Sequence, residues 1–400
     1  MIWDRRTYRV TDPGRVSVIA YAVGGIGLVL SLIALFVDRP QFLHSWLVAF
    51  TFWTTISLGG LFFVMLHHLS GSTWSVVLRR VAESIMALLP YLIFPALVLL
   101  LNLREIYHWT NQDAVAADSL LREKSAYLNI PFFYIRTLIY FAVWTTLTIM
   151  LRRTSLAQDK GHTDPIGARF TRISAPGMIL FAVTCTFAAF DWLMSLDAHW
   201  YSTIFGVYIF AGAVVGALAV IVLAALHLRA QGVLTKAITT GHYHDLGKLL
   251  FAFIIFWAYM AFSQYFLIWY GNIPEETIWY LRRWAGWWKG VSLLLVFGHF
   301  VIPFFLLLPY ASKRNPRMLA VIAGWMLLMH WVDLYWIVMP ARPGGAFAPS
   351  WIDLAAMATL SGLAVGRFWT TFTSQPLVPV GDPKLETSLH QYQQPVEEYD

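Results

Sequence analysis

The sequence predicts an all-α protein that crosses a membrane about ten times. Three observations indicate this class: 58% of the 400 residues are hydrophobic, only 12% are charged, and long apolar runs recur along the chain. Soluble domains carry roughly 25% charged residues, about twice this share. Because lipid offers the backbone no hydrogen bonds, only helices or closed barrels span it, and apolar runs of roughly 20 residues are typical of helices.

Ten apolar segments are long enough to cross the hydrocarbon layer. They are residues 16–37, 42–66, 81–101, 131–151, 176–193, 203–228, 249–269, 287–308, 318–339 and 352–368. We therefore divide the chain into an N-terminal cytoplasmic segment (1–15), a transmembrane domain (16–372) and a C-terminal cytoplasmic tail (373–400). The tail is polar and contains proline, so we expect it to lie along a cytoplasmic surface or to be partly disordered.

The Lys and Arg residues predict the orientation of the helices. With the N-terminus in the cytoplasm, most of the 28 Lys and Arg residues fall on the cytoplasmic side. This bias follows the positive-inside rule and places both termini in the cytoplasm. It also explains the net charge of +6 without nucleic-acid binding. Two loops on the opposite side, 102–130 and 271–286, are longer than a turn, and they either cap the bundle or dock an external partner subunit.

The cysteine and histidine residues limit which cofactors the chain could bind. The single cysteine, Cys185, cannot form an internal disulfide, an iron–sulfur site or a four-thiolate zinc site. The CxxCH motif for covalent haem attachment does not occur in the sequence. A haem held between His299 and His330 is disfavoured, because no second histidine pair is equally well placed. We expect no metal site and no cofactor bound by this chain, although a menaquinol or quinone could bind it.

Ionisable side chains in the apolar segments are the functional candidates, because each is costly to place in lipid. Those in the outer half or just beyond it are Arg136, Asp191, Asp197, His199, Lys289, Asp333 and Asp353. His299 and His330 lie near mid-depth, and the i, i+3 spacing places His330 and Asp333 on one helix face. A carboxylate beside a histidine can pass a proton.

A second set of ionisable residues lies near the cytoplasmic helix ends. Its members are His67, His68, Glu83, His227 and Lys248. Long side chains at such depths can extend to water, which is the structural alternative for this set. For the outer set, the structural alternative is a network of salt bridges.

Three stretches carry a family resemblance. They are FDWLMSLDAHWYSTIFGVYIFAG at 190–212, SQYFLIWYGNIPEET at 263–277 and HWVDLYW at 330–336. Together with the helix count and the chain length, they resemble the second large NrfD-like membrane subunit, of the ActF type, in bacterial alternative complex III.

The resemblance implies a place in a quinol:cytochrome c oxidoreductase of the bacterial cytoplasmic (inner) membrane. Such complexes oxidise menaquinol or a related quinol and pass electrons through iron–sulfur clusters and c-type haems on other subunits. The resemblance implies that this chain has no redox centre and folds as two four-helix bundles with flanking helices. The implied partners are a paralogous NrfD-like subunit, an iron–sulfur/molybdopterin-like subunit and c-type cytochrome subunits, besides membrane lipids.

Three functions follow as hypotheses, and the sequence leaves open whether the chain itself catalyses a reaction. The first, which we favour together with structural support, is proton translocation along a route through His67, Glu83, His299, His330, Asp333, Lys289, Asp191 and Asp197. The second is direct quinol oxidation near the periplasmic face, in a pocket formed by Arg136, Asp191, His330 and Asp353. The third is a secondary transporter or scaffold, indicated by Gly298, Pro303 and Gly324 within membrane segments.

Overall fold

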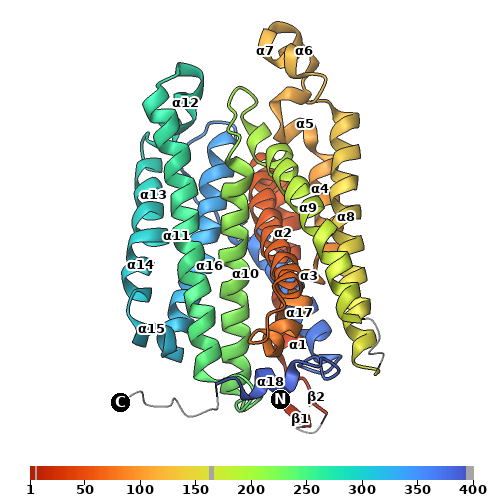
Figure 1. The fold of residues 1–400 in the computed structure, drawn as a ribbon. Helices are drawn as coiled ribbons and strands as arrows, with labels where there is room; N and C mark the ends of the chain where they lie inside the picture. Colours follow the sequence, from red (N-terminus) through yellow and green to blue (C-terminus); the bar gives the residue numbers. More distant parts are fainter. Residues whose placement is uncertain (5–6, 162–165, 393–400) are drawn as a thin grey trace.

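The computed structural model describes residues 1–4, 7–161 and 166–392, and the protein is 79% helical. The long helices run side by side, with α6, α7 and α12 at one end and α15, α18 and the N-terminal strands at the other (Figure 1). We call these the α12 end and the α18 end. Among the described residues, nine helical segments are long and apolar enough to cross a membrane. The chain is therefore a multi-pass helical membrane protein, as the sequence predicts.

The nine segments follow the predicted ones closely. They are α1 (Val16–Val37), α2 (Arg39–Ser70), α3 (Val76–Met86) continued by η1 (Leu89–Leu92) and α4 (Ile93–Leu101), α8 (Ile130–Gln158), α9 (Ile166–Trp192), α10 (Phe205–Ala230), α11 (Thr240–Gly271), α13 (Trp288–Leu294) continued by η4 (Leu295–Val301) and α14 (Ile302–Leu307), and α16 (Pro316–Val338).

Shorter elements connect these segments. They are β1 (Ile2–Asp4), β2 (Arg9–Asp12), α5 (Leu103–Ile106), η2 (His108–Thr110), α6 (Gln112–Ala117), α7 (Ser119–Lys124), η3 (Met194–Leu196), α12 (Pro274–Arg283), α15 (Tyr310–Arg314), η5 (Met339–Ala341) and α18 (Leu385–His390). The strands β1 and β2 pair antiparallel at the start of the chain, and this small sheet was not predicted from the sequence.

The tenth predicted segment, 352–368, is helical but less apolar than the nine. It forms α17 (Trp351–Thr373), which packs against α1 more extensively than any other pair of helices. A Cβ at Gly362 would lie 2.2 Å from the backbone nitrogen of Gly24, so glycine lets the two backbones approach closely. Nine of the ten predicted segments thus have the length and hydropathy of a membrane-crossing helix in the described structure, and the tenth, α17, is a long helix packed beside α1.

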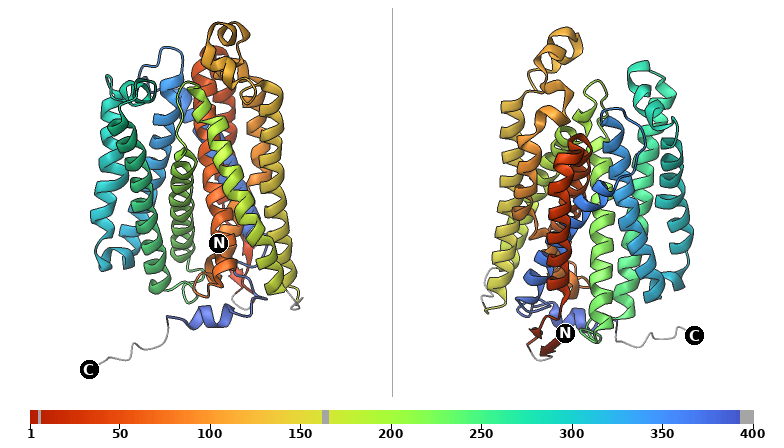
Figure 2. Two further views of the ribbon diagram at one scale, coloured as in Figure 1. Left: turned by 45° about the horizontal axis from the view of Figure 1, so that its top comes forward. Right: turned by 180° about the vertical axis from the view of Figure 1, so that it is seen from behind.

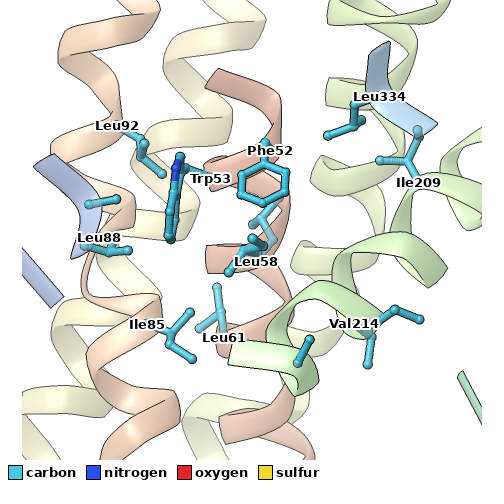
Figure 3. Packing of buried hydrophobic residues seen from close by; sticks show 14 of the residues in the cluster. Phe52, Trp53, Leu58, Leu61, Ile85, Leu88, Leu92, Ile209, Val214 and Leu334 are labelled. Carbon is cyan, nitrogen blue, oxygen red and sulfur yellow. The ribbon is translucent and has the colours of Figure 1, made fainter. Parts of the chain in front are cut away.

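Helix α2 is the central helix of the bundle. In α2, 94% of the apolar stretch is buried inside the protein. In α1 the corresponding share is 28%, so most of the surface of α1 is exposed on the outside of the bundle. The helix α10 packs against α2. The helices α11–α16 lie on one side of this pair, and α3, α4, α8 and α9 lie on the other (Figures 1 and 2). Around α2, Phe52 and Leu58 lie between Ile85 of α3 and residues of α10 and α16, such as Ile209 and Leu334 (Figure 3).

The described part of the C-terminal tail packs across the α18 end. Leu377 and Val378 are buried, and the backbone N–H of Leu377 donates to the carbonyl of Tyr8 over 2.9 Å. Lys384 Nζ donates to the carbonyl of Gly71 over 2.5 Å. These contacts join the two ends of the chain at one end of the bundle. Residues 393–400, which include part of the tail predicted to be disordered, lie outside the described residues.

Candidate functional site

Asp333 of α16 lies at the centre of the candidate site and is 2% exposed. Trp257 Nε1 of α11 donates to Asp333 Oδ2 over 3.1 Å, and the hydroxyl of Tyr208 of α10 donates to Oδ1. No Lys, Arg or His of the described chain forms an ion pair with Asp333. Three helices thus hold this carboxyl group with neutral donors alone.

His299 packs on a face of the Trp257 indole ring. The two rings are stacked, with centroids 3.6 Å apart and planes 20° apart. His299 is fully buried, and neither ring nitrogen has a hydrogen-bond partner among the described residues. A buried imidazole without partners is costly, so this position needs an explanation beyond packing.

The helix that carries His299 is irregular at this point. Residues Leu295–Val301 form a π-helix, a rare element that is frequent at functional sites. Pro303 has no N–H for the carbonyl groups four and five residues before it, which belong to His299 and Gly298. The Gly298 carbonyl instead accepts a hydrogen bond of 2.7 Å from Trp325 Nε1 of α16. Proline therefore accounts for the irregular turn that presents His299 to Trp257.

His330 lies one helical turn before Asp333 and is 1% exposed. Its Nε2 is 2.8 Å from Thr55 Oγ1 of α2, whereas Nδ1 has no partner within the described structure. A Cβ at Gly212 of α10 would lie 3.1 Å from His330 Nδ1 and 3.7 Å from Trp257 Cδ1. Glycine at 212 is thus what allows α10 to pack against both rings. The predicted pair His330 and Asp333 therefore joins His299 in one buried group, which we call the Asp333 cluster (Tyr208, Trp257, His299, His330 and Asp333).

A cavity of about 660 Å³ adjoins the Asp333 cluster. It lies among α11, α12, α13 and η4, and its walls include Tyr208 and Trp257, the two donors to Asp333. Gln264 and Tyr280 also line it, and Gln264 Nε2 donates to the Tyr280 hydroxyl over 3.0 Å. Most of the lining is aromatic or aliphatic, and the volume is typical of cavities that bind small molecules.

A second buried carboxylate, Asp191 of α9, has a different environment. Arg136 of α8 donates to it twice, from Nε over 2.7 Å and from Nη2 over 2.9 Å, and the Tyr140 hydroxyl donates over 2.6 Å. The Arg136 guanidinium also packs over the ring of Tyr127, 3.8 Å from its centroid. Such a two-pronged pair is a strong and geometrically specific interaction. Arg136 and Asp191, two predicted quinone-pocket residues, thus bind each other in a buried ion pair.

Glu83 of α3 belongs to a third buried group, near the α18 end. Its carboxylate oxygens lie 3.0 Å from Arg79 Nε and 3.0 Å from Arg80 Nη1, and Ser155 Oγ donates to it over 2.7 Å. Arg79 also pairs with Asp382 of the tail, and Arg80 pairs with Asp159. Both arginines are at most 1% exposed.

The remaining predicted residues lie apart from the Asp333 cluster. Asp197 is paired with the exposed Arg282 over 2.8 Å, and exposed Lys289 lies over the ring of Trp284. Asp353 completes a capping box at the start of α17 by accepting from the Ser350 N–H, and it also accepts hydrogen bonds from Gln41 and Ser45 of α2. His67 Nδ1 is 2.7 Å from Ser75 Oγ. No hydrogen bond or ion pair found in the described residues links His67 or Glu83 to Asp333.

Sequence reasoning missed the two side chains that hold Asp333. Tyr208 and Trp257 are neutral and lie in apolar segments rich in aromatic residues, so their types carried no distinguishing signal. The capping role of Asp353 had a signal, since Ser350 followed three residues later by an acidic residue at a helix start is a capping box. Among the described residues, no group of three or more His, Cys, Asp or Glu residues is placed to hold a metal ion.

The Asp333 cluster can therefore accept and release a proton within an apolar bundle. It contains one carboxyl group, two imidazoles and one phenol, and ionisable groups buried in this way mark proton relays in membrane proteins. Comparison with known protein families found no match, and neither did comparison with curated protein sequences.

Proposed function

We propose that this chain is the proton-handling membrane subunit of a quinol:electron-acceptor oxidoreductase of the alternative complex III type. Quinol oxidation releases protons as well as electrons, and iron–sulfur clusters and haems on the partner subunits would carry the electrons. In this proposal the chain holds no redox centre of its own. The resemblance of residues 190–212, 263–277 and 330–336 to the ActF type supports the assignment to this complex.

The proposal includes an arrangement in the bacterial cytoplasmic membrane. Helices α2 to α9 and α10 to α16 would form the two four-helix bundles, with α1 and α17 flanking them. The basic residues of the α18 end support a cytoplasmic position for both termini. The α12 end would then face the periplasm and meet the partner subunits.

One observation carries the proton-handling role: Asp333 is buried at the junction of α10, α11 and α16, and no Lys or Arg of the described residues pairs with it. Arg136 neutralises Asp191, and Arg79 and Arg80 neutralise Glu83. Asp333 instead accepts hydrogen bonds from a phenol and an indole. Two imidazoles of the same cluster, His299 and His330, each have at least one ring nitrogen without a hydrogen-bond partner among the described residues. A carboxyl group that no cation keeps ionised can change its protonation state without breaking an ion pair.

The structure also bears on the alternative of quinol oxidation by this chain. The four residues predicted for that pocket are Arg136, Asp191, His330 and Asp353. None of them lines the cavity beside the Asp333 cluster. Arg136, Asp191 and Asp353 already have hydrogen-bond partners within the fold. We therefore favour proton handling over direct quinol oxidation.

The test uses the intact complex in proteoliposomes, with protons released per electron as the readout. We expect Asp333→Asn to lower this ratio or to slow turnover, because asparagine keeps the shape but cannot exchange a proton. Asp353→Asn is the matched control, since Asp353 is also buried and also lacks an ion pair among the described residues, but it lies at the start of α17, where Gln41, Ser45 and the Ser350 N–H donate to it. Wild-type stoichiometry and turnover in Asp333→Asn would remove Asp333 from the proton route.

A further inference from the structure

The cavity beside the Asp333 cluster opens toward the lipid phase. Phe262, Trp269 and Leu281 lie on its walls, and their side chains are 62%, 58% and 63% exposed on the surface of the apolar bundle. Large exposed apolar side chains on a membrane helix face lipid. A molecule could therefore enter this cavity sideways from the bilayer, between α11 and η4.

A buried cation forms part of the cavity wall at the α12 end. The guanidinium of Arg283 is 4% exposed and packs over the Trp279 ring, 3.4 Å from its centroid. It donates to three backbone carbonyls, those of Trp336, Trp279 and Ile337, over 3.0, 3.0 and 2.7 Å. An arginine has five N–H donors, so two remain.

The charge of Arg283 has no carboxylate of its own. No ion pair joins Arg283 to a carboxylate of the described residues, and nearby Asp197 already pairs with Arg282 over 2.8 Å. Burial lowers the pKa of Arg283 to about 9, so the group is still charged at neutral pH. Two arginines thus share one aspartate, and one positive charge is left beside the cavity. A buried, uncompensated charge is unfavourable.

We propose that the cavity binds an anionic phospholipid of the leaflet at the α12 end, with its phosphate near Arg283 and an acyl chain directed toward Trp257. The depth agrees with this orientation, because α12 carries Trp279, Tyr280 and two arginines, the residue types found at a membrane interface. The proposal goes beyond the proton role of Asp333 and does not depend on it.

A quinone fits the cavity less well than a phospholipid. At the inner end, the Tyr208 hydroxyl and Trp257 Nε1 already donate to Asp333, so they are not free to bind a quinone oxygen. A neutral quinone ring also cannot offset the charge of Arg283 at the other end. A phosphate group does so, and its acyl chain needs no hydrogen bonds.

The test measures lipid binding to the purified full-length chain by native mass spectrometry. The probes are phosphatidylglycerol and phosphatidylcholine with identical acyl chains, inorganic phosphate, and a menaquinone. We expect the wild-type chain to retain phosphatidylglycerol preferentially. Arg283→Gln should lower this preference about fivefold, the contribution of one basic residue near an anionic lipid. Arg122→Gln is the matched control and should keep the preference, because Arg122 is an exposed arginine of α7 at the same end of the bundle and does not line this cavity.

A second variant keeps the test decisive if Arg283→Gln does not fold. Ala261→Trp fills the cavity from the α11 wall and should displace the bound lipid, whereas Ala252→Trp, on the exposed surface of the same helix, should not. Equal binding of both phospholipids would overturn the proposal. The proposal would also be overturned if the chain retained inorganic phosphate but neither phospholipid. It would likewise be overturned if Ala261→Trp lost a bound menaquinone while its binding of phosphatidylglycerol stayed unchanged.

Discussion

Asp191 and Asp333 are two buried carboxylates in the α12-end half of the same bundle, and their surroundings differ in charge. Asp191 accepts two hydrogen bonds from Arg136 and one from Tyr140. Asp333 accepts bonds from Tyr208 and Trp257, with His299 stacked behind the indole. The exposed fractions, 0% and 2%, do not distinguish the two sites.

The difference shows how to separate structural from functional ionisable residues within a membrane. Depth alone assigned both aspartates to the same proton route. The counter-ion separates them, because a carboxylate paired with arginine must break that pair before it can take up a proton. We therefore interpret Asp191 and Glu83 as residues that stabilise the fold, and our proposal assigns proton exchange to Asp333.

The largest expected effect is on stability at the Asp191 site. Asp191→Asn leaves the guanidinium of Arg136 buried without its counter-charge, so we expect the free energy of unfolding to fall by about 3–5 kcal/mol. Asp333→Asn breaks no ion pair and should cost less than about 2 kcal/mol. Unfolding in mixed micelles measures both. Equal losses of stability in the two variants would contradict the interpretation that Asp191 is part of a structural ion pair and Asp333 is not.

The second prediction extends the comparison to the α18 end. Glu83→Gln removes the carboxylate that two buried arginines share, and we expect a loss of about 3 kcal/mol. Glu386→Gln provides a control, because Glu386 lies on the exposed face of α18 and should change stability by less than about 0.5 kcal/mol. The same unfolding assay compares them. A wild-type stability for Glu83→Gln would indicate that Asp159 and Asp382 suffice for both arginines.

A smaller effect is expected from crowding the Asp333 cluster. Gly212→Val places carbon atoms against His330 and Trp257, and overpacking of this kind costs about 1–3 kcal/mol. Because these rings belong to the Asp333 cluster, turnover of the complex should fall as well. Gly25→Val, at a position on α1 with open space around it, is the control. If Gly212→Val leaves turnover unchanged, the packing of these rings does not matter for proton exchange.

The smallest effect concerns an exposed pair in the loop at the α12 end. His199 Nε2 is 2.6 Å from Asp118 Oδ2, and this hydrogen bond, with the backbone N–H of Leu121, lowers the pKa of Asp118 below 3.8. Because the folded-state pKa is the lower one, the stabilisation is complete above pH 3.8 and is lost as the pH falls through the folded value. Hydrogen exchange of α7 should therefore accelerate in Asp118→Asn at neutral pH. Identical exchange in the variant and the wild type would show that the pair is not formed in solution.

The positions and types of the long helices were predictable, because each depends on a local run of apolar residues. The helical period places His330 and Asp333 one turn apart on α16, but the structure gives them different partners, Thr55 for His330 and Tyr208 and Trp257 for Asp333. In contrast, the partners Tyr208 and Trp257 depend on which faces of α10 and α11 meet α16. A single sequence does not contain that information, since many aromatic residues occupy equivalent positions.

The arginines of α3 show a second limit of sequence reasoning. Arg79 and Arg80 satisfy the positive-inside rule, and the rule says nothing about whether a basic residue reaches water. Arg79 pairs with Asp382, which lies some 300 positions away along the chain and reaches it because the tail folds back, and Arg80 pairs with Asp159.

The central claim, that Asp333 exchanges protons and Asp191 does not, is tested most directly by infrared spectroscopy of the reconstituted complex. The carbonyl stretch of a protonated carboxyl group is recorded as the pH is changed. We predict a pH-dependent carbonyl band that disappears in Asp333→Asn and persists in Asp353→Asn. A pH-dependent band that survives Asp333→Asn unchanged, or no pH-dependent band in the wild type, would contradict the claim.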